Sequence, residues 1–297
     1  MGLSIVNNDF ILPPKQEKME ANPKEIDVRP LFAPLHENLI DLLKSLEKED
    51  WQKPTIARFW NIKQVTAHIL DGNIRALSIQ RDQYNAEQPP AIDAYQQLVG
   101  WLNQLNADWI KAFNRVSPQV LIALLQATGP EVNHYFSSLP LNEKAIFPVA
   151  WAGETESLNK LHIAREYTER WLHQQQIRDA LERPGIMIRK FFYPFIHTFM
   201  QGLPKAYQEV IADTDTHITI EVTGEIGGVW HLLKTTEKWK LVDVPKNTPD
   251  AQISIPPDIA WKLFSKGINP VIARREVKIK GKEALGLHAL NMVSVMA

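Results

Sequence analysis

Apolar residues change their spacing near Pro184, and this change constrains the fold more than any other feature of the chain. From Pro30 to about Leu181 they recur every three or four residues, as on amphipathic helices. Beyond residue 206 they alternate with polar residues, which is typical of half-buried strands. Because the two patterns do not interleave, the sequence predicts an α+β protein with an N-terminal up-down helical bundle and a small C-terminal α+β domain.

The expected domain organisation follows from these patterns and from the breaks between them. Residues 1–29 are polar and contain prolines, which predicts a flexible lead-in. The bundle is expected over residues 30–183, and the sequence ERPG at residues 182–185 ends its last helix. A bridging helix with an internal Gly-Leu-Pro break is expected over residues 184–205, followed by the α+β domain over residues 206–297.

Each domain is expected to contain several regular elements. In the bundle, four long helices and a shorter or interrupted one are expected over residues 31–51, 61–84, 92–116, 118–139 and 158–181. In the second domain, strands are expected over residues 217–224, 228–235, 238–244 and 251–256, a helix over 257–267, and a strand followed by a closing helix over 275–296. The Gly129-Pro130 pair predicts a bend in the fourth stretch of the bundle.

The composition excludes several classes of protein. A net charge of −1 and a pI of about 6.8 give no overall attraction to nucleic acid or to an anionic membrane, so neither is an expected partner. No run of about 18 apolar residues occurs, and the N-terminus lacks the features of a secretory signal. A cytoplasmic location is therefore expected, with translation starting at either Met1 or Met19.

The chain contains no cysteine. This excludes disulfides, zinc sites built from thiolates and a cysteine nucleophile. Any reaction of this protein that involves a thiol must therefore take the thiol from a separate molecule.

Four titratable residues share one face of the helix expected over residues 158–181. They are His162, Glu166, Glu169 and His173, and they lie on a stripe about 60° wide. A polar stripe usually faces solvent, and this explanation stays open for His162 and Glu166, with orientation of neighbouring ligands as the alternative. For Glu169 and His173, a spacing of four residues on a rigid helix is a standard way to fix two metal ligands.

A third ligand is available on the second expected helix. His68 lies three residues after Val65, on or beside the apolar face of that helix. A lone histidine in this position is more often a hydrogen-bonded core residue. Together with Glu169 and His173, however, it makes up the inward-facing set of histidines and carboxylates from which metal sites in bundles are built.

Several short motifs along the chain keep a distinctive order and spacing. The bundle contains Asp50-Trp51-x-x-Pro54-Thr55, then Trp60, then Val65-x-x-His68-Ile69, and later Glu169-x-x-x-His173-x-x-Gln176-Ile177. This pattern resembles the DinB-like metal-binding four-helix bundles, and more specifically the mycothiol-dependent maleylpyruvate isomerase family. In the second domain, the stretches VTGEIGGVWHL, DAQISIPPDIAWKLFSKG and VKIKGKEAL resemble the sterol-carrier-like module of that family. The resemblance covers nearly the whole chain after Pro30.

The resemblance implies a metal- and thiol-dependent isomerase or transferase. A divalent metal, zinc by default, would be held by His68, Glu169 and His173, with water filling the open positions. In the named isomerase, mycothiol adds to maleylpyruvate, the double bond rotates and the thiol leaves. The implied partners are therefore a low-molecular-weight thiol and a small electrophilic substrate, and a chain without cysteine fits a thiol supplied from outside.

Two features concern the substrate side of the implied site. An arginine of the C-terminal domain contributes to activity in the isomerase, and the nearest candidates for this catalytic role here are Arg274 and Arg275, although solvated surface charge is the commoner explanation for such residues. Where relatives often have a Cys-Pro-Gly-Trp-like run before the second helix, this chain has ARFW at residues 57–60. This departure lies near the expected mouth of the site and leaves the substrate open.

Two other interpretations stay open. The chain could be a non-catalytic, metal-containing small-molecule binding or stress-response protein of the DinB-like superfamily. Alternatively, His68, Glu169 and His173 could form a satisfied polar cluster that holds no metal. Bundles of this kind often pair as homodimers, but no stretch of the sequence defines an interface.

Overall fold

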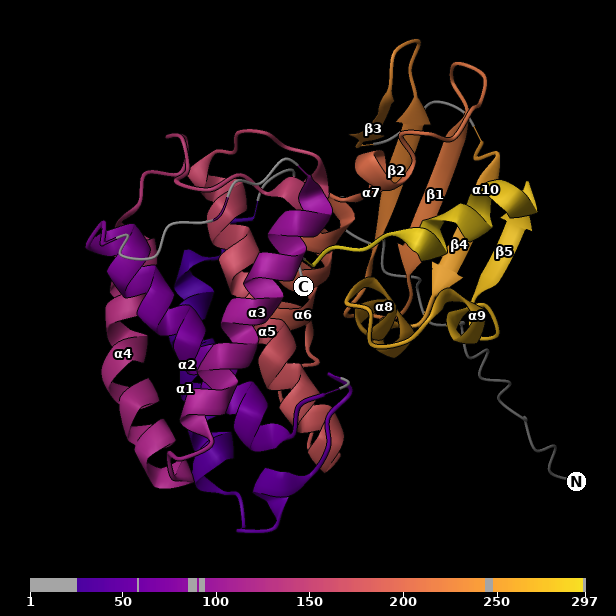
Figure 1. Ribbon diagram of the computed structural model, residues 1–297. Helices are drawn as coiled ribbons and strands as arrows, with labels where there is room; N and C mark the ends of the chain where they lie inside the picture. Colours follow the sequence, from indigo (N-terminus) through magenta and orange to yellow (C-terminus); the bar gives the residue numbers. More distant parts are fainter. Residues whose placement is uncertain (1–25, 58, 85–89, 91–93, 244–247, 296–297) are drawn as a thin grey trace, which may run out of the picture.

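The computed structural model describes residues 26–57, 59–84, 90, 94–243 and 248–295 (Figure 1). Most of the predicted lead-in and both predicted start positions, Met1 and Met19, lie outside these residues. The described chain forms a helical part followed by a mixed sheet with short helices, so the predicted α+β class is confirmed. In the described residues, no helix combines the length and the apolar character that a membrane span requires.

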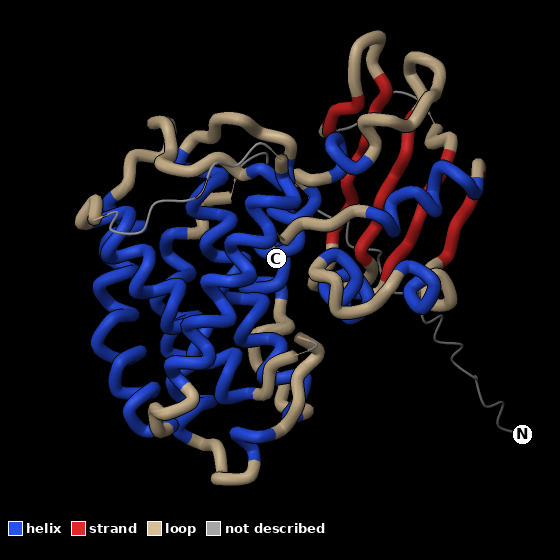
Figure 2. Tube along the Cα trace, viewed as in Figure 1, coloured by secondary structure: helices blue, strands red, loops and turns tan. Residues whose placement is uncertain are grey.

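The helical part is an antiparallel bundle whose long helices lie side by side in Figure 2. The helices are α1 (Phe32–Lys44), α2 (Ile62–Arg75), α3 (Tyr95–Phe113), α4 (Pro118–Ser138) and α5 (Asn159–Leu181). Helix α2 begins at a capping box formed by Asn61 and Gln64, and a π-helical turn over Ala76–Arg81 extends it. Helix α4 runs without interruption past Pro130. Helix α5 ends where Glu182 takes a left-handed backbone conformation, as the sequence predicts.

Helix α5 is largely buried although it is rich in polar residues. This stretch of the sequence has few aliphatic side chains. Its buried residues include Tyr167 and Trp171 and the polar residues His162, Glu166, Gln174 and Arg178. Internal partners satisfy these polar groups. Arg178 donates hydrogen bonds to the carbonyl oxygens of Pro184, at 2.8 Å, and Asn38, at 3.0 Å. Burial of these polar side chains is tolerated where their donors and acceptors are paired inside the protein.

After the bundle, α6 (Arg189–Met200) and α7 (Leu203–Ala206) connect to the sheet, and the predicted break between them falls at Gly202. Within the described residues, the sheet has the strand order β3-β2-β1-β4-β5, with β1 and β4 parallel and the other neighbours antiparallel. The strands are β1 (His217–Val222), β2 (Gly228–Lys234), β3 (Trp239–Val242), β4 (Ala251–Ile255) and β5 (Lys278–Gly281). The remaining helices are α8 (Pro257–Phe264), α9 (Pro270–Ala273) and α10 (Glu283–His288).

One hydrophobic core connects the bundle with the sheet domain. Trp171 of α5 stacks on Phe195 of α6 at 3.9 Å between ring centroids, and it meets Trp261 of α8 edge-on at 6.4 Å. An ion pair of 2.9 Å between Lys262 of α8 and Asp179 of α5 borders the same contact. The two parts of the chain therefore share one hydrophobic core.

A second contact between the parts involves His197 of α6. Its Nδ1 accepts a hydrogen bond of 3.1 Å from the indole nitrogen of Trp230 on β2. Burial lowers the pKa of His197 to about 4, so the ring is neutral at physiological pH and keeps the lone pair that this bond requires. His197 therefore links α6 to the sheet.

We predict that Trp171→Ala lowers the free energy of unfolding by about 3–5 kcal/mol, because it removes a fully buried aromatic ring from the junction. Urea unfolding followed by circular dichroism measures this loss. The matched control is Phe59→Ala, since the Phe59 side chain is 90% exposed and its removal should cost less than about 0.5 kcal/mol. Equal effects of the two substitutions would contradict the packing described here.

Candidate active site

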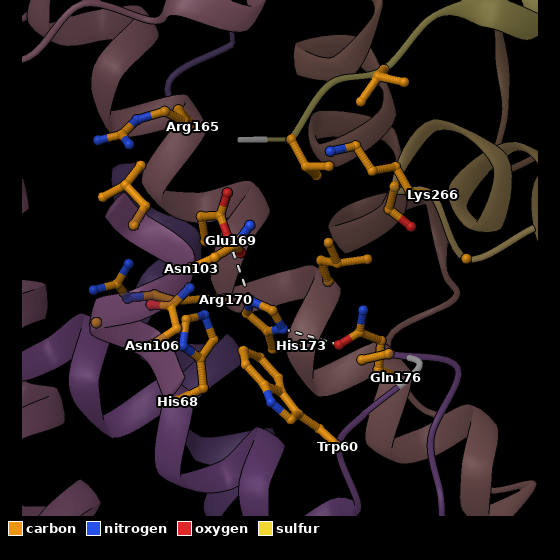
Figure 3. A pocket seen from close by; sticks show the side chains of 18 of the residues that line it. Trp60, His68, Asn103, Asn106, Arg165, Glu169, Arg170, His173, Gln176 and Lys266 are labelled. Atoms are coloured by element: carbon orange, nitrogen blue, oxygen red, sulfur yellow. Dashed lines mark hydrogen bonds and ion pairs between the residues drawn. The ribbon is translucent and has the colours of Figure 1, made fainter. Parts of the chain in front are cut away.

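A large cavity of about 1340 Å³ lies between the bundle and the sheet domain. The bundle contributes residues of α2, α3 and α5 and the segment before α2. The sheet domain contributes the loop between α8 and α9 and the C-terminal segment. All three predicted metal ligands line this cavity, together with Trp60, Arg75, Asn106, Arg165, Arg170, Gln176 and Lys266 (Figure 3).

His68 faces the cavity from the middle of α2. The ring of Trp60 packs on it at 4.7 Å between centroids. The Nδ1 atom of His68 is buried and has no hydrogen-bond partner among the described residues. Burial, together with the nearby His173 and Arg75, holds the pKa of His68 well below its usual value, so the ring is neutral. The Nδ1 atom of His68 thus lacks, among the described residues, the hydrogen bond that a satisfied core histidine would make.

His173 faces His68 across the site, with the ring centroids 4.6 Å apart. Its Nδ1 lies 2.9 Å from Oε1 of Gln176. Because an amide oxygen only accepts, Nδ1 must carry the proton, and Nε2 of a neutral ring then carries a lone pair. Nε2 is buried, has no hydrogen-bond partner among the described residues and lies 3.4 Å from Oε2 of Glu169. A lone pair and a carboxylate oxygen at this distance repel each other unless a proton or a cation lies between them.

These observations bear on whether the residues suit a metal. Among the described residues, no group of three or more His, Cys, Asp or Glu side chains is arranged so that it could already hold a metal ion. The donor chemistry nevertheless fits, because two buried histidine nitrogens lack partners and a carboxylate lies beside one of them. Two histidines and one glutamate form a known ligand set of catalytic zinc. The cavity thus contains suitable donor atoms, although in the described residues they are not arranged around one point.

His162 and Glu166 belong to a different group of residues, and the suggestion that they face solvent is wrong. His162 is fully buried, and Glu166 is 8% exposed. Nε2 of His162 lies 2.8 Å from Oε1 of Gln80, and Nδ1 lies 3.0 Å from the guanidinium of Arg165. Burial lowers the pKa of His162 to about 4, which keeps the ring neutral. None of these hydrogen bonds reaches the three predicted ligands.

Glu166 is held between two arginines. Its carboxylate accepts hydrogen bonds from Arg165, at 2.6 Å, and from Arg170, at 3.0 Å. Burial alone would raise the pKa of Glu166, but the two guanidinium groups outweigh it and lower the pKa to about 2. The guanidinium of Arg170 also lies over the rings of Phe32 and Phe136, at 5.5 and 5.2 Å. This cluster stabilises the bundle beside the cavity.

The arginines that were predicted to be catalytic do not line the cavity. Arg274 forms an exposed ion pair of 2.6 Å with Glu283, and Arg275 is exposed. Their positions do not support the predicted catalytic role, which therefore stays a prediction. Among the described residues, the cations of the cavity wall are instead Arg75, Arg165, Arg170 and Lys266. No sequence motif distinguished these residues, although Arg165 and Arg170 adjoin the polar stripe of α5.

Comparisons with known proteins identify the family. Residues 32–178 match the family model described as the mycothiol maleylpyruvate isomerase N-terminal domain. The chain belongs to this family through its helical bundle. The matched residues include the positions of His68 and Glu169 as well as His173. No curated protein sequence matches the chain closely enough to count as a relative.

Solved structures extend the likeness beyond the bundle. A crystal structure of the mycothiol-dependent maleylpyruvate isomerase, in a mutant with a histidine replaced by alanine, superposes with a TM-score of 0.51 and 8% sequence identity. The match covers 85% of this chain and 91% of that one, which shows a shared fold across most of both proteins. A second structure of that isomerase matches with a TM-score of 0.49 and 8% identity, over 79% of this chain and 86% of the other.

We predict different consequences for two neighbouring carboxylates of α5. Glu166→Gln should lower the free energy of unfolding by about 3–5 kcal/mol, because it removes a buried carboxylate and leaves the partly buried Arg165 and Arg170 without their counter-charge. Glu169→Gln is the matched control, since its side chain is 33% exposed and has no arginine partner among the described residues. Its effect should stay below about 1 kcal/mol when unfolding is measured in urea with EDTA present. A larger loss in Glu169→Gln than in Glu166→Gln would contradict these assignments.

Proposed function

We propose that this chain is a cytoplasmic, metal-dependent enzyme that uses a low-molecular-weight thiol, of the mycothiol type, in isomerisation or S-transfer on an electrophilic substrate. The observation that carries the proposal is the meeting of His68 and His173 in a large cavity, each with a buried nitrogen that lacks a partner. Membership of the mycothiol maleylpyruvate isomerase N-terminal domain family supports the choice of a thiol.

In this proposal His68, Glu169 and His173 hold the metal, and zinc is the ion that best suits two imidazoles and one carboxylate. A bound zinc ion is a Lewis acid that lowers the pKa of a thiol or a water molecule and polarises an acceptor. An external thiol needs this help because an ordinary thiol is mostly protonated at neutral pH. Since three protein ligands leave open positions, the same site has room for the thiol.

The neighbouring side chains keep the ligands in their reactive form. The side-chain oxygen of Gln176 accepts a hydrogen bond from Nδ1–H of His173, which orients Nε2 towards the cavity. Trp60 packs against His68 and shields the site from water on that side. Arg75, which pairs with Asp71 at 2.7 Å and reaches Asn106 at 3.3 Å, lies where it can stabilise negative charge that develops during the reaction.

One observation favours the non-catalytic alternative, a metal-containing small-molecule binding protein. Among the described residues no three ligands are already arranged around one point, whereas catalytic metal sites are usually held in place by their neighbours. The hydrogen bond between Gln176 and His173 and the contact between Trp60 and His68 are supports of that kind, and they favour the enzyme.

We predict that the purified protein contains about one zinc ion per chain, as a site with three ligands and open positions should. His68→Ala and His173→Ala should each contain less than about a tenth of that amount, because each removes a ligand that the proposal requires. Inductively coupled plasma mass spectrometry gives the metal content. His134→Ala is the matched control, since this exposed histidine of α4 does not line the cavity. Equal metal contents in all four proteins would refute the proposed ligands.

Thiol-dependent turnover separates the enzyme from the binding protein. The metal-loaded protein is incubated with mycothiol, bacillithiol or glutathione and a panel of activated alkenes, and product formation is followed by chromatography. The proposal expects turnover with one of these thiols and its loss in His68→Ala. Stoichiometric metal with no thiol-dependent turnover would favour the binding protein instead.

A further inference from the structure

Part of the apolar face of helix α3 lines the cavity and is not fully covered by the described residues. Of the residues of α3, all of which the structure describes, only Asn106 and Ile110 are buried. Leu98, Trp101, Leu102 and Leu105 recur at helical spacing and all line the cavity, where each remains partly exposed. An amphipathic helix of this kind normally packs its apolar face on another element, so the face points to an apolar occupant of the cavity.

The C-terminal segment forms another apolar wall of the same cavity. Figure 1 shows this segment leaving the sheet domain and reaching the bundle. Met292, Val293 and Val295 line the cavity. Ser294 fixes the segment, because its hydroxyl donates to the carbonyl of Phe199 at 2.9 Å and its backbone N–H donates to the carbonyl of Phe264 at 3.0 Å. This wall is therefore tied to the core shared by both parts of the chain.

The size of the cavity exceeds the needs of a small electrophile. Its volume of about 1340 Å³ lies above the range of about 300–1,000 Å³ that is typical of sites for drug-sized ligands. A thiol carried on a polar, sugar-like body would need hydrogen-bonding partners, which the leucines of α3 and the valines of the C-terminal segment do not offer. These walls suit a hydrocarbon or aryl group.

Lys266 provides a free positive charge at this cavity. No carboxylate among the described residues pairs with it, whereas Arg75 is paired with Asp71, and Arg165 and Arg170 share Glu166. Lys266 has a left-handed backbone conformation, with φ of 64°, which is unfavourable for a residue with a side chain. In Figure 3 its ammonium group extends from the sheet domain towards the bundle. A strained residue that presents an unpaired charge to a cavity is a candidate for a role in binding.

We infer that the cavity takes an amphiphilic carboxylate, with an apolar body of roughly ten carbon atoms lying between α3 and the C-terminal segment and the carboxylate at Lys266. This inference deepens the proposed function, because it names the class of electrophile on which the thiol-dependent reaction acts. The binding itself does not involve the three metal ligands. It can therefore be tested apart from metal content and turnover.

Isothermal titration calorimetry with decanoate and butanoate tests the inference on the purified full-length chain. Each buried methylene strengthens binding by about fourfold, so decanoate should bind about 100-fold or more tightly than butanoate. Leu102→Gln should weaken decanoate at least about tenfold, because it places a polar group on the apolar wall. Leu124→Gln is the matched control, since this 37% exposed leucine of α4 lies outside the cavity and its substitution should leave the affinity unchanged.

The charge is tested with Lys266→Met and the uncharged ligand 1-decanol. Lys266→Met should weaken decanoate about tenfold and leave 1-decanol unaffected, because only the carboxylate contacts the ammonium group. His68→Ala should bind decanoate as the wild type does, whether or not the metal prediction holds. Thermal unfolding of each variant shows whether it is folded.

Several results would overturn the inference. Decanoate and butanoate could bind with equal affinity, or neither could bind. Decanoate binding could be lost in His68→Ala and kept in Leu102→Gln, which would place the carboxylate on a metal. Sedimentation analysis could show a dimer that Leu102→Gln converts to a monomer without any binding of decanoate, which would make the face of α3 a contact between two copies of the chain.

Discussion

The structure depends on the burial of α5, a helix with many polar residues and few aliphatic ones, in the centre of the bundle. The different faces of α5 are buried against different partners. Tyr167 and Trp171 pack towards α6 and α8, and the hydroxyl of Tyr167 donates to the carbonyl of Phe191 at 2.8 Å. The opposite, polar stripe meets α2 and the cavity. Because α5 contacts both parts of the chain, its packing also fixes the position of the sheet domain over the site.

Residues that look equivalent on the stripe of α5 have different surroundings. Glu166 has two arginine partners and a pKa of about 2, and its charge is compensated inside the protein. Glu169 is one turn further along, and among the described residues its titratable neighbour within 4 Å is His173, at 3.4 Å. A carboxylate whose charge is neutralised by two arginines stabilises the fold but is not free to bind a cation. A carboxylate without an arginine partner, beside a histidine nitrogen that lacks a hydrogen bond, is available for a cation.

Much of the fold could be predicted from the sequence, because the spacing of apolar residues along the chain indicates which side of each helix or strand is buried. The helices, the described strands and the break at Gly202 follow from that pattern, and the motifs around His68 and His173 indicated the family. The burial of His162 and Glu166 could not be predicted, since a polar stripe gives no sign of whether buried partners exist for it. Gln80 meets His162 only through tertiary packing, whereas Arg170 lies on α5 itself, one turn after Glu166. For the same reason, the sequence directed attention to Arg274 and Arg275 and missed Lys266, which reaches the cavity because of a local backbone conformation.

The central claim is that His68, Glu169 and His173 bind one metal ion in the cavity between the bundle and the sheet domain. Crystals grown with zinc, with diffraction data collected on both sides of the zinc absorption edge, test it most directly. The account predicts one strong anomalous peak at about 2.0–2.1 Å from a nitrogen of His68 and from Nε2 of His173, with Glu169 at a similar distance. The absence of an anomalous peak at these side chains, or a peak only elsewhere in the molecule, would contradict it.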